Sequence, residues 1–204
     1  YQSDVKTFLT SSTDAILGKI IRQDDYASLQ LNQRNAWEEE IAILKHTLRG
    51  FDEGLIIFEY SIPRLGKRID AVLLLRGIVF ILEFKVGESH FLRQDIDQVW
   101  DYALDLKNFH EESHDKTIVP LLIATEASDE HISSTTNLCR YDDHVYEPIC
   151  TNKAYLLYFI ESTLDKVKQI DRYHCSRWLF SRYSPTPTII EAASYLFNNH
   201  SVEN

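Results

Sequence analysis

The sequence contains no methionine, only three cysteines and no long apolar run. The cysteines, at positions 139, 150 and 175, have no CxxC spacing, and their odd number gives no disulfide framework, so we expect reduced thiols and a cytoplasmic protein. No apolar stretch reaches the roughly 18 residues of a membrane span, and we expect no membrane partner. No phosphate loop of the form G-x-x-x-x-G-K-[ST] occurs, so these residues alone should not hydrolyse ATP.

Histidines and charge carry weaker signals. The histidines at positions 90, 110, 114, 131, 144 and 174 are scattered without an HExxH motif or a cysteine at zinc spacing, and we interpret most as loop residues. The net charge of −10 argues against a general nucleic-acid coat. Residues 64–93 nevertheless carry a net charge of +3, from six basic and three acidic side chains. This basic segment is compatible with phosphate contacts, and equally with basic residues at hairpin ends.

A β-hairpin is the clearest predicted element. Residues 68–75 and 78–86 are both rich in isoleucine, valine, leucine and phenylalanine. Arg76 and Gly77 separate them as a two-residue turn, with glycine supplying a positive φ. Apolar side chains occur on both faces of the two strands, which predicts that the hairpin is buried on both faces.

Three charged residues interrupt this apolar hairpin: Asp70 in its first strand, and Glu83 and Lys85 in its second. Pairing by equal steps from the turn places Asp70 opposite Glu83, with Cβ atoms about 4.5–5.5 Å apart. Lys85 shares their face because side chains alternate along a strand. Two such close carboxylates repel unless a cation lies between them, and Mg²⁺ suits oxygen ligands beside phosphate. The alternative is a structural ion cluster in which Lys85 neutralises both acids.

The remaining pattern predicts an α/β fold, with a central mixed β-sheet flanked by helices and an additional helical part at the C-terminus. We expect strands at 55–61 and 118–125 and helices at 33–48, 94–109, 151–171 and 186–198. Residues 1–32 show weak helical patterning, and 128–148 have no clear pattern.

Two helices carry polar residues of interest. In 33–48, Glu40 falls near the centre of the apolar face and Glu39 at its edge, so either acid is a partner in a buried pair or a ligand. In 94–109, Gln98 and Tyr102 lie on one side at i and i+4. Their alternative interpretation is a core tyrosine beside a surface amide.

Asp70 with Glu83-Phe84-Lys85 resembles the core of the PD-(D/E)XK nuclease superfamily, which has the restriction-endonuclease-like fold. Gln98-x-x-x-Tyr102 on the following helix is similar to the QxxxY element of RecB-like members. The resemblance covers residues 33–125, and position 69 is isoleucine where the family motif has proline.

The resemblance implies a metal-dependent catalytic site. Asp70 and Glu83 would coordinate Mg²⁺ (or Mn²⁺), with the backbone carbonyl of Phe84 as another ligand. Lys85 would orient or deprotonate the attacking water. Gln98 would orient this lysine or a phosphate. The expected catalytic residues are therefore Asp70, Glu83, Lys85 and Gln98.

Further roles follow from the same resemblance. Glu40, or Glu39 in second place, would hold a water or a second metal. Tyr102 would contact the backbone of the substrate. Apart from the resemblance, the charge of the basic segment 64–93 makes Lys67 and Arg68 candidate nucleic-acid contacts.

A wider resemblance, from GKRIDAVLLL through LEFKVGE to YSPTPTIIEAA, is to the N-terminal region of large bacterial proteins in which a nuclease-like domain precedes a Schlafen-type DNA/RNA helicase domain. It implies an N-terminal extension at 1–32, a nuclease core at 33–125 and a mostly helical extension at 126–204 that packs on the core or leads to an absent helicase domain.

The expected function is Mg²⁺-dependent hydrolysis of phosphodiester bonds in nucleic acid, with DNA favoured over RNA, as part of a bacterial defence system. The alternative is an inactive nucleic-acid-binding or protein-interaction domain that keeps the fold.

Overall fold

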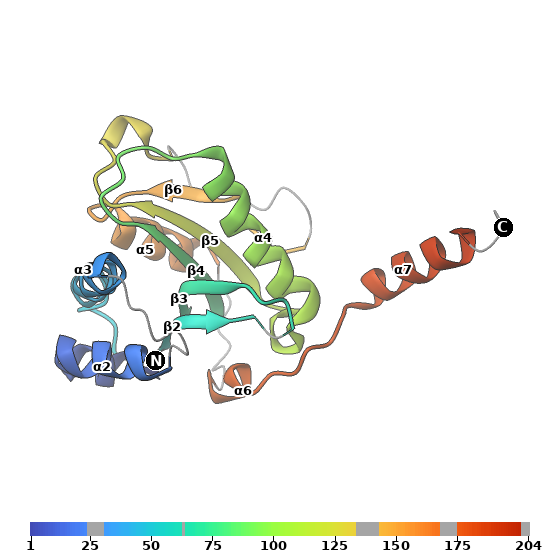
Figure 1. Ribbon diagram of the computed structural model, residues 1–204, viewed down its shortest axis with the longest axis horizontal. Coiled ribbons are helices and arrows are strands. Elements are labelled where there is room, and N and C mark those ends of the chain that lie inside the picture. Colours follow the sequence, from blue (N-terminus) through green and yellow to red (C-terminus); the bar gives the residue numbers. More distant parts are fainter. Residues whose placement is uncertain (24–30, 63, 134–142, 168–174, 201–204) are drawn as a thin grey trace.

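The structure is a computed structural model that describes residues 1–23, 31–62, 64–133, 143–167 and 175–200. These residues form one mixed sheet with the strand order β1-β2-β3-β4-β5-β6, flanked by helices, which confirms the expected α/β class (Figure 1). Pairing is antiparallel from β1 to β4 and parallel from β4 to β6. The strands are β1 (Gln2–Asp4), β2 (Leu55–Ser61), β3 (Arg68–Leu75), β4 (Ile78–Lys85), β5 (Thr117–Ala124) and β6 (Ile149–Thr151).

The β3–β4 hairpin has the predicted register. Leu75 pairs with Ile78, and pairing continues by equal steps to Ala71 opposite Leu82. Both turn residues have positive φ, 49° at Arg76 and 84° at Gly77, as a tight hairpin whose twist matches its strands requires.

Alternate side chains of this hairpin enter two separate cores, one on each face of the sheet, so the prediction of burial on both faces is confirmed. Helices α3 (Leu31–Thr47) and α5 (Leu156–Lys166) cover one face, with Trp37 fully buried beneath them. Helices α4 (Arg93–Phe109) and α6 (Cys175–Leu179) cover the other, where Trp178 is fully buried. Figure 1 shows α3 and α4 on opposite sides of the central strands.

The N-terminal segment belongs to the same sheet and core. Strand β1 pairs with β2, and helices α1 (Val5–Thr10) and α2 (Thr13–Gln23) follow it. Val5, Phe8 and Ile16 are completely buried in the core that α3 also covers. The sequence did not reveal this because a three-residue strand and a six-residue helix are too short for a periodic signal.

The helix expected at 151–171 is correct only in part. Strand β6 ends at Thr151, α5 runs from Leu156 to Lys166, and 168–171 lie outside the described residues. Two short 3₁₀ helices, η1 (Glu111–Ser113) and η2 (Asp129–His131), flank β5.

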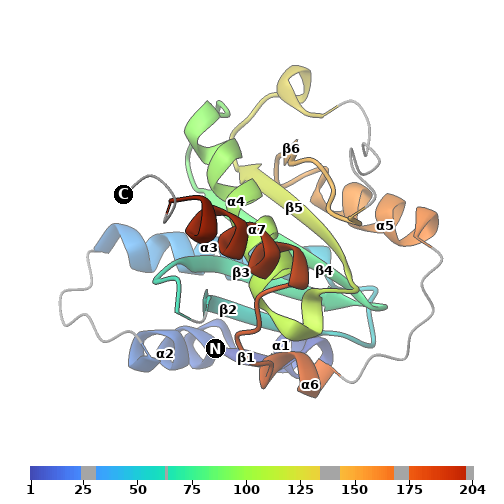
Figure 2. The same cartoon turned by 90° about the vertical axis from the view of Figure 1, so that its right-hand side faces the viewer.

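The last helix, α7 (Pro187–His200), extends away from the rest of the molecule in Figure 1 and lies in front of the sheet, toward the viewer, in Figure 2. It exposes Ile190, Leu196 and Phe197. None of the described helices is both long and apolar enough to cross a membrane.

Candidate active site

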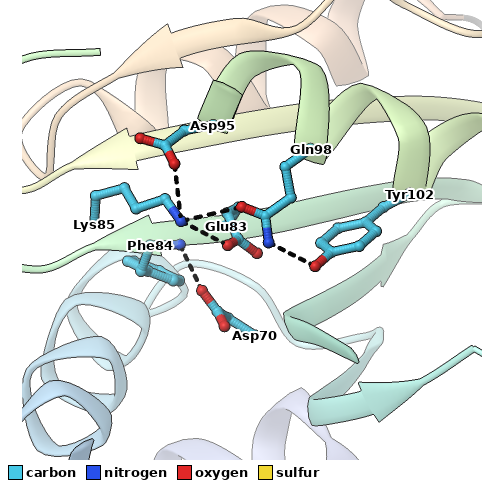
Figure 3. Close-up of polar contacts among 7 residues, drawn as sticks. All are labelled: Asp70, Glu83, Phe84, Lys85, Asp95, Gln98 and Tyr102. Carbon is cyan, nitrogen blue, oxygen red and sulfur yellow. Dashed lines mark hydrogen bonds and ion pairs between the residues drawn. The ribbon is translucent and has the colours of Figure 1, made fainter. Parts of the chain in front are cut away.

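Strands β3 and β4 separate at the position of the two hairpin acids. The recorded pairing ends at Ala71 opposite Leu82, one step before Asp70 and Glu83. At that step the Asp70 carboxylate accepts a hydrogen bond from the backbone N–H of Phe84 at 2.8 Å (Figure 3). Elsewhere between the two strands a backbone carbonyl accepts such a bond, whereas here a side-chain oxygen does. This bond holds the Asp70 side chain beside the end of β4.

The neighbouring strand β2 is distorted at the same level. Its pairing with β3 is recorded for Phe58 with Ala71 and for Tyr60 with Ile69, but not between them, at Glu59. Glu59 has a φ of 54°, in the left-handed region that non-glycine residues seldom occupy and that clusters at functional sites.

Contacts on both sides hold the Glu59 side chain in place. Trp37 Nε1 donates to one of its carboxylate oxygens at 2.6 Å, and Arg68 Nε lies 2.6 Å from the other. The sequence analysis missed this residue. Its only signal was that it is the single charged residue of β2, whose sequence is LIIFEYS.

Glu40 brings a further acid to this site from α3. Its side chain is 4% exposed, and its Oε2 is buried without a hydrogen-bond partner among the described residues. Burial raises the pKa of Glu40 well above its ordinary value, and the nearby charges of Asp70, Glu59 and Glu83 raise it further. A carboxyl group placed in this way is costly to ionise unless a cation approaches it.

These acids line one surface pocket of about 340 Å³ between α3 and the sheet. Its lining includes Glu40, Glu59, Asp70 and Lys85, together with Phe84. The structure therefore brings Asp70 and Lys85 of the hairpin and Glu40 of α3 to a common cavity, while Glu83 is not among its lining residues.

Lys85 is the centre of the polar network on the α4 side of the pocket. Its ammonium group lies 3.0 Å from Glu83 Oε1, 3.4 Å from Asp95 Oδ1 and 3.3 Å from Gln98 Oε1 (Figure 3). Gln98 in turn donates from Nε2 to the hydroxyl oxygen of Tyr102 at 2.7 Å. Gln98 therefore links Lys85 to Tyr102 by hydrogen bonds.

Asp95 is a second site residue that the sequence analysis missed. It is buried, at 9% exposed, in the first turn of α4. It precedes Gln98 by three positions, so the two share a helix face. That spacing was the available signal.

Burial and neighbouring charges shift the pKa values of the acids and the lysine in this site. Burial raises the pKa of Asp70 to about 7, helped by the charge of Glu83, although the Phe84 N–H and Lys85 pull it down. Burial also raises the pKa of Glu83, against the opposing effect of Lys85. For Lys85 burial lowers the pKa, but Glu83 and Asp95 outweigh it, and the pKa ends above its ordinary value. The lysine is therefore an ammonium ion at neutral pH.

The other predicted residues lie outside the pocket lining or are engaged by acids. Glu39 lies 3.9 Å from Lys153 and is not among the residues that line the pocket, whereas Glu40 is one of them. Lys67 is 2.7 Å from Asp105 and lines a second pocket, of about 450 Å³, that Gln98 and Tyr102 also line. Arg68 is paired with Glu59, as described above.

The residues present fit a divalent cation, although they do not form a complete cage. No group of three or more histidine, cysteine, aspartate or glutamate side chains is arranged to hold a metal within the described ranges. Asp70 and Glu83 supply carboxylate oxygens of the kind that Mg²⁺ prefers, and Mg²⁺ commonly keeps several waters. The Oε2 atom of Glu83, like that of Glu40, is buried and has no hydrogen-bond partner among the described residues. A cation would satisfy both the charge and these oxygens.

Comparison with known proteins adds no relative: no family model, curated protein or solved structure matches the chain.

Proposed function

We propose that this chain is a metal-dependent nuclease of the PD-(D/E)XK type that hydrolyses phosphodiester bonds, with DNA favoured over RNA. One observation carries the proposal: Asp70, Glu83 and Lys85 lie together at the end of β4, with more buried negative charge around them than the lysine neutralises. A purely structural ion cluster needs no such excess, because unpaired buried charge is destabilising.

In this proposal the chain's own residues bind and orient the reactants. Asp70 and Glu83 would hold Mg²⁺ or Mn²⁺, assisted by the Phe84 carbonyl, and Glu40 would hold a water or a second metal. The ion, when bound, supplies charge neutralisation and an activated water. Among the described residues, Asp70 accepts one hydrogen bond, at Oδ2 from the Phe84 N–H, so its carboxylate retains lone pairs for this role.

Lys85 acts as a fixed positive charge. Its raised pKa favours the ammonium form, which stabilises charge developing on the phosphate and orients the attacking water rather than deprotonating it. Gln98, held by Tyr102, keeps the ammonium group at the pocket edge. A residue that positions another in this way should affect turnover more than substrate affinity.

A second candidate function is a non-catalytic module that binds nucleic acid or protein. One observation favours its protein-binding form: Lys67 and Arg68, the basic residues expected to contact phosphates, are each paired with an acid. A helicase portion elsewhere in a longer protein, as the wider resemblance implies, would then supply the positive surface.

Cleavage assays with labelled single- and double-stranded DNA and RNA test the proposal. The chain is incubated with Mg²⁺, Mn²⁺ or EDTA, beside Asp70→Ala and Lys85→Ala. We expect metal-dependent cleavage that both substitutions abolish. The matched controls Asp165→Ala and Lys6→Ala change exposed residues outside the pocket and should cleave like the wild type.

The two candidates differ in whether the folded wild-type chain cleaves the nucleic acid that it binds. A nuclease loses cleavage but keeps most of its affinity for nucleic acid, measured by fluorescence anisotropy. Absence of cleavage by folded wild-type protein, with affinity unchanged in Asp70→Ala, would reject the nuclease in favour of the binding module.

A further inference from the structure

The loops that follow β4 and β5 are tied together where these parallel strands end. The backbone N–H of Thr125 donates to the carbonyl of Lys85 at 3.2 Å, and that of Glu126 to the carbonyl of Glu88 at 3.0 Å. Gly87 N–H donates to the Thr125 hydroxyl at 2.9 Å, and its φ of 79° provides the turn that glycine adopts without strain. These bonds hold the two loops in a defined relative position.

Two histidines, one from each loop, lie side by side as a result. The ring centroids of His90 and His131 are 5.6 Å apart, and the rings are tilted by 39°. Each Nδ1 is hydrogen-bonded to a serine hydroxyl, that of Ser89 at 2.8 Å and that of Ser128 at 3.2 Å. Both imidazoles are exposed, and the described part of the chain gives neither Nε2 a hydrogen-bond partner.

This arrangement has the features of metal ligation by histidine. A hydrogen bond at one ring nitrogen selects the tautomer in which the other nitrogen binds the ion. With a Zn–N bond of about 2.0–2.1 Å, the centroids of two imidazoles on one ion lie about 5–6 Å apart. The observed 5.6 Å lies within this range.

We infer that His90 and His131 form a second metal site, which takes a transition-metal ion such as Zn²⁺ or Cu²⁺ and is separate from the carboxylate pocket. Imidazole suits these ions, whereas carboxylate and water suit Mg²⁺, so the two sites select different metals. Within the described residues no third histidine, cysteine, aspartate or glutamate completes a cluster, so water takes the remaining positions. The ion links the two loops beside Lys85.

Titration of the untagged chain with Zn²⁺ by isothermal calorimetry, in excess Mg²⁺ that occupies the carboxylate pocket, tests the inference. We expect one ion per chain with a dissociation constant of roughly 1–100 µM, about what half of a four-ligand structural zinc site provides. His90→Ala and His131→Ala should each weaken binding about tenfold or more. His46→Ala, which changes an exposed histidine on α3, is the matched control and should bind like the wild type.

A spectroscopic measurement identifies the donors independently of affinity. Electron paramagnetic resonance of the Cu²⁺-loaded chain should show two coupled imidazole nitrogens in the wild type and one or none in either single variant. Asp70→Ala should leave both readouts unchanged, which separates this site from the proposed nuclease site. Wild-type binding by both histidine variants, or loss of Zn²⁺ in Asp70→Ala, would overturn the inference, since both exposed histidines can be replaced without disturbing the core.

Discussion

The two sides of the candidate active site differ in how their charges are balanced. On the α4 side, the Lys85 ammonium group has three partners, in Glu83, Asp95 and Gln98. On the α3 side, Glu40 is almost fully buried and has an oxygen without a partner among the described residues. The chain supplies Lys85 to the acids of the α4 side, whereas on the α3 side Arg68 pairs with Glu59 and Glu40 has no basic partner among the described residues. The α3 side is arranged as if a cation came from solution.

The largest expected effect comes from removing the cation of the α4 side. On the proposed nuclease function, Lys85→Ala should reduce cleavage by about 10²–10⁴-fold, because it would remove a fixed charge beside the reacting phosphate. It should also lower the free energy of unfolding by roughly 2–4 kcal/mol, since it leaves Glu83 and Asp95 buried without their partner. Urea denaturation measures the second effect. Stability equal to that of Lys6→Ala would show that the network contributes nothing to folding.

The next effect tests whether the acids lack a cation. The pKa of Asp70 is about 7 in the folded chain against 3.8 ordinarily, so the metal-free protein loses stability as pH rises from about 4 through 7. Asp70→Asn keeps an oxygen for the Phe84 N–H but cannot ionise. In EDTA at pH 8 it should exceed the wild type in stability by about 2–4 kcal/mol.

Two comparisons complete this test. At pH 4 the difference between Asp70→Asn and the wild type should vanish, because the wild-type carboxyl is then protonated. Added Mg²⁺ at pH 8 should raise the melting temperature of the wild type and not that of the variant. A wild type that is the more stable of the two at pH 8 in EDTA would contradict this account.

A smaller effect separates the two neighbouring acids of α3. Glu40→Gln should raise the stability of the metal-free chain at pH 8 by about 1–3 kcal/mol, because it removes a buried charge. Glu39→Gln is the matched control, since that side chain is 37% exposed and lies near Lys153, and it should change stability by less than about 0.5 kcal/mol. Thermal denaturation in EDTA measures both, and equal shifts would mean that the burial of Glu40 has no energetic consequence.

The smallest effect sharpens the description of the α4 side. Tyr102→Phe removes the hydroxyl that accepts from Gln98, which should cost about 1 kcal/mol of stability. Cleavage should fall a few-fold through kcat with KM little changed, because Gln98 is less firmly held beside Lys85. A change confined to KM would instead support the direct substrate contact expected for Tyr102 from the sequence.

The hairpin was predictable because its signals are local. A two-residue turn and continuous apolar strands specify the β3–β4 register, and a one-residue slip would move every side chain to the other face. The i, i+4 spacing likewise anticipated the contact between Gln98 and Tyr102. The assignment of Lys67 and Arg68 as phosphate contacts relied on charge alone, which does not reveal the acids that face them.

The amino-acid sequence by itself determined the central hairpin and its register, the presence of Asp70, Glu83 and Lys85 in its two strands, and the α/β class, because side-chain alternation and turn chemistry act between near neighbours. Only the tertiary structure decided that Glu59 and Asp95 join the site, that Glu40 rather than Glu39 faces the pocket, and that His90 meets His131. These outcomes depend on how segments far apart in the chain pack, and on a left-handed residue in β2 that no local pattern announces.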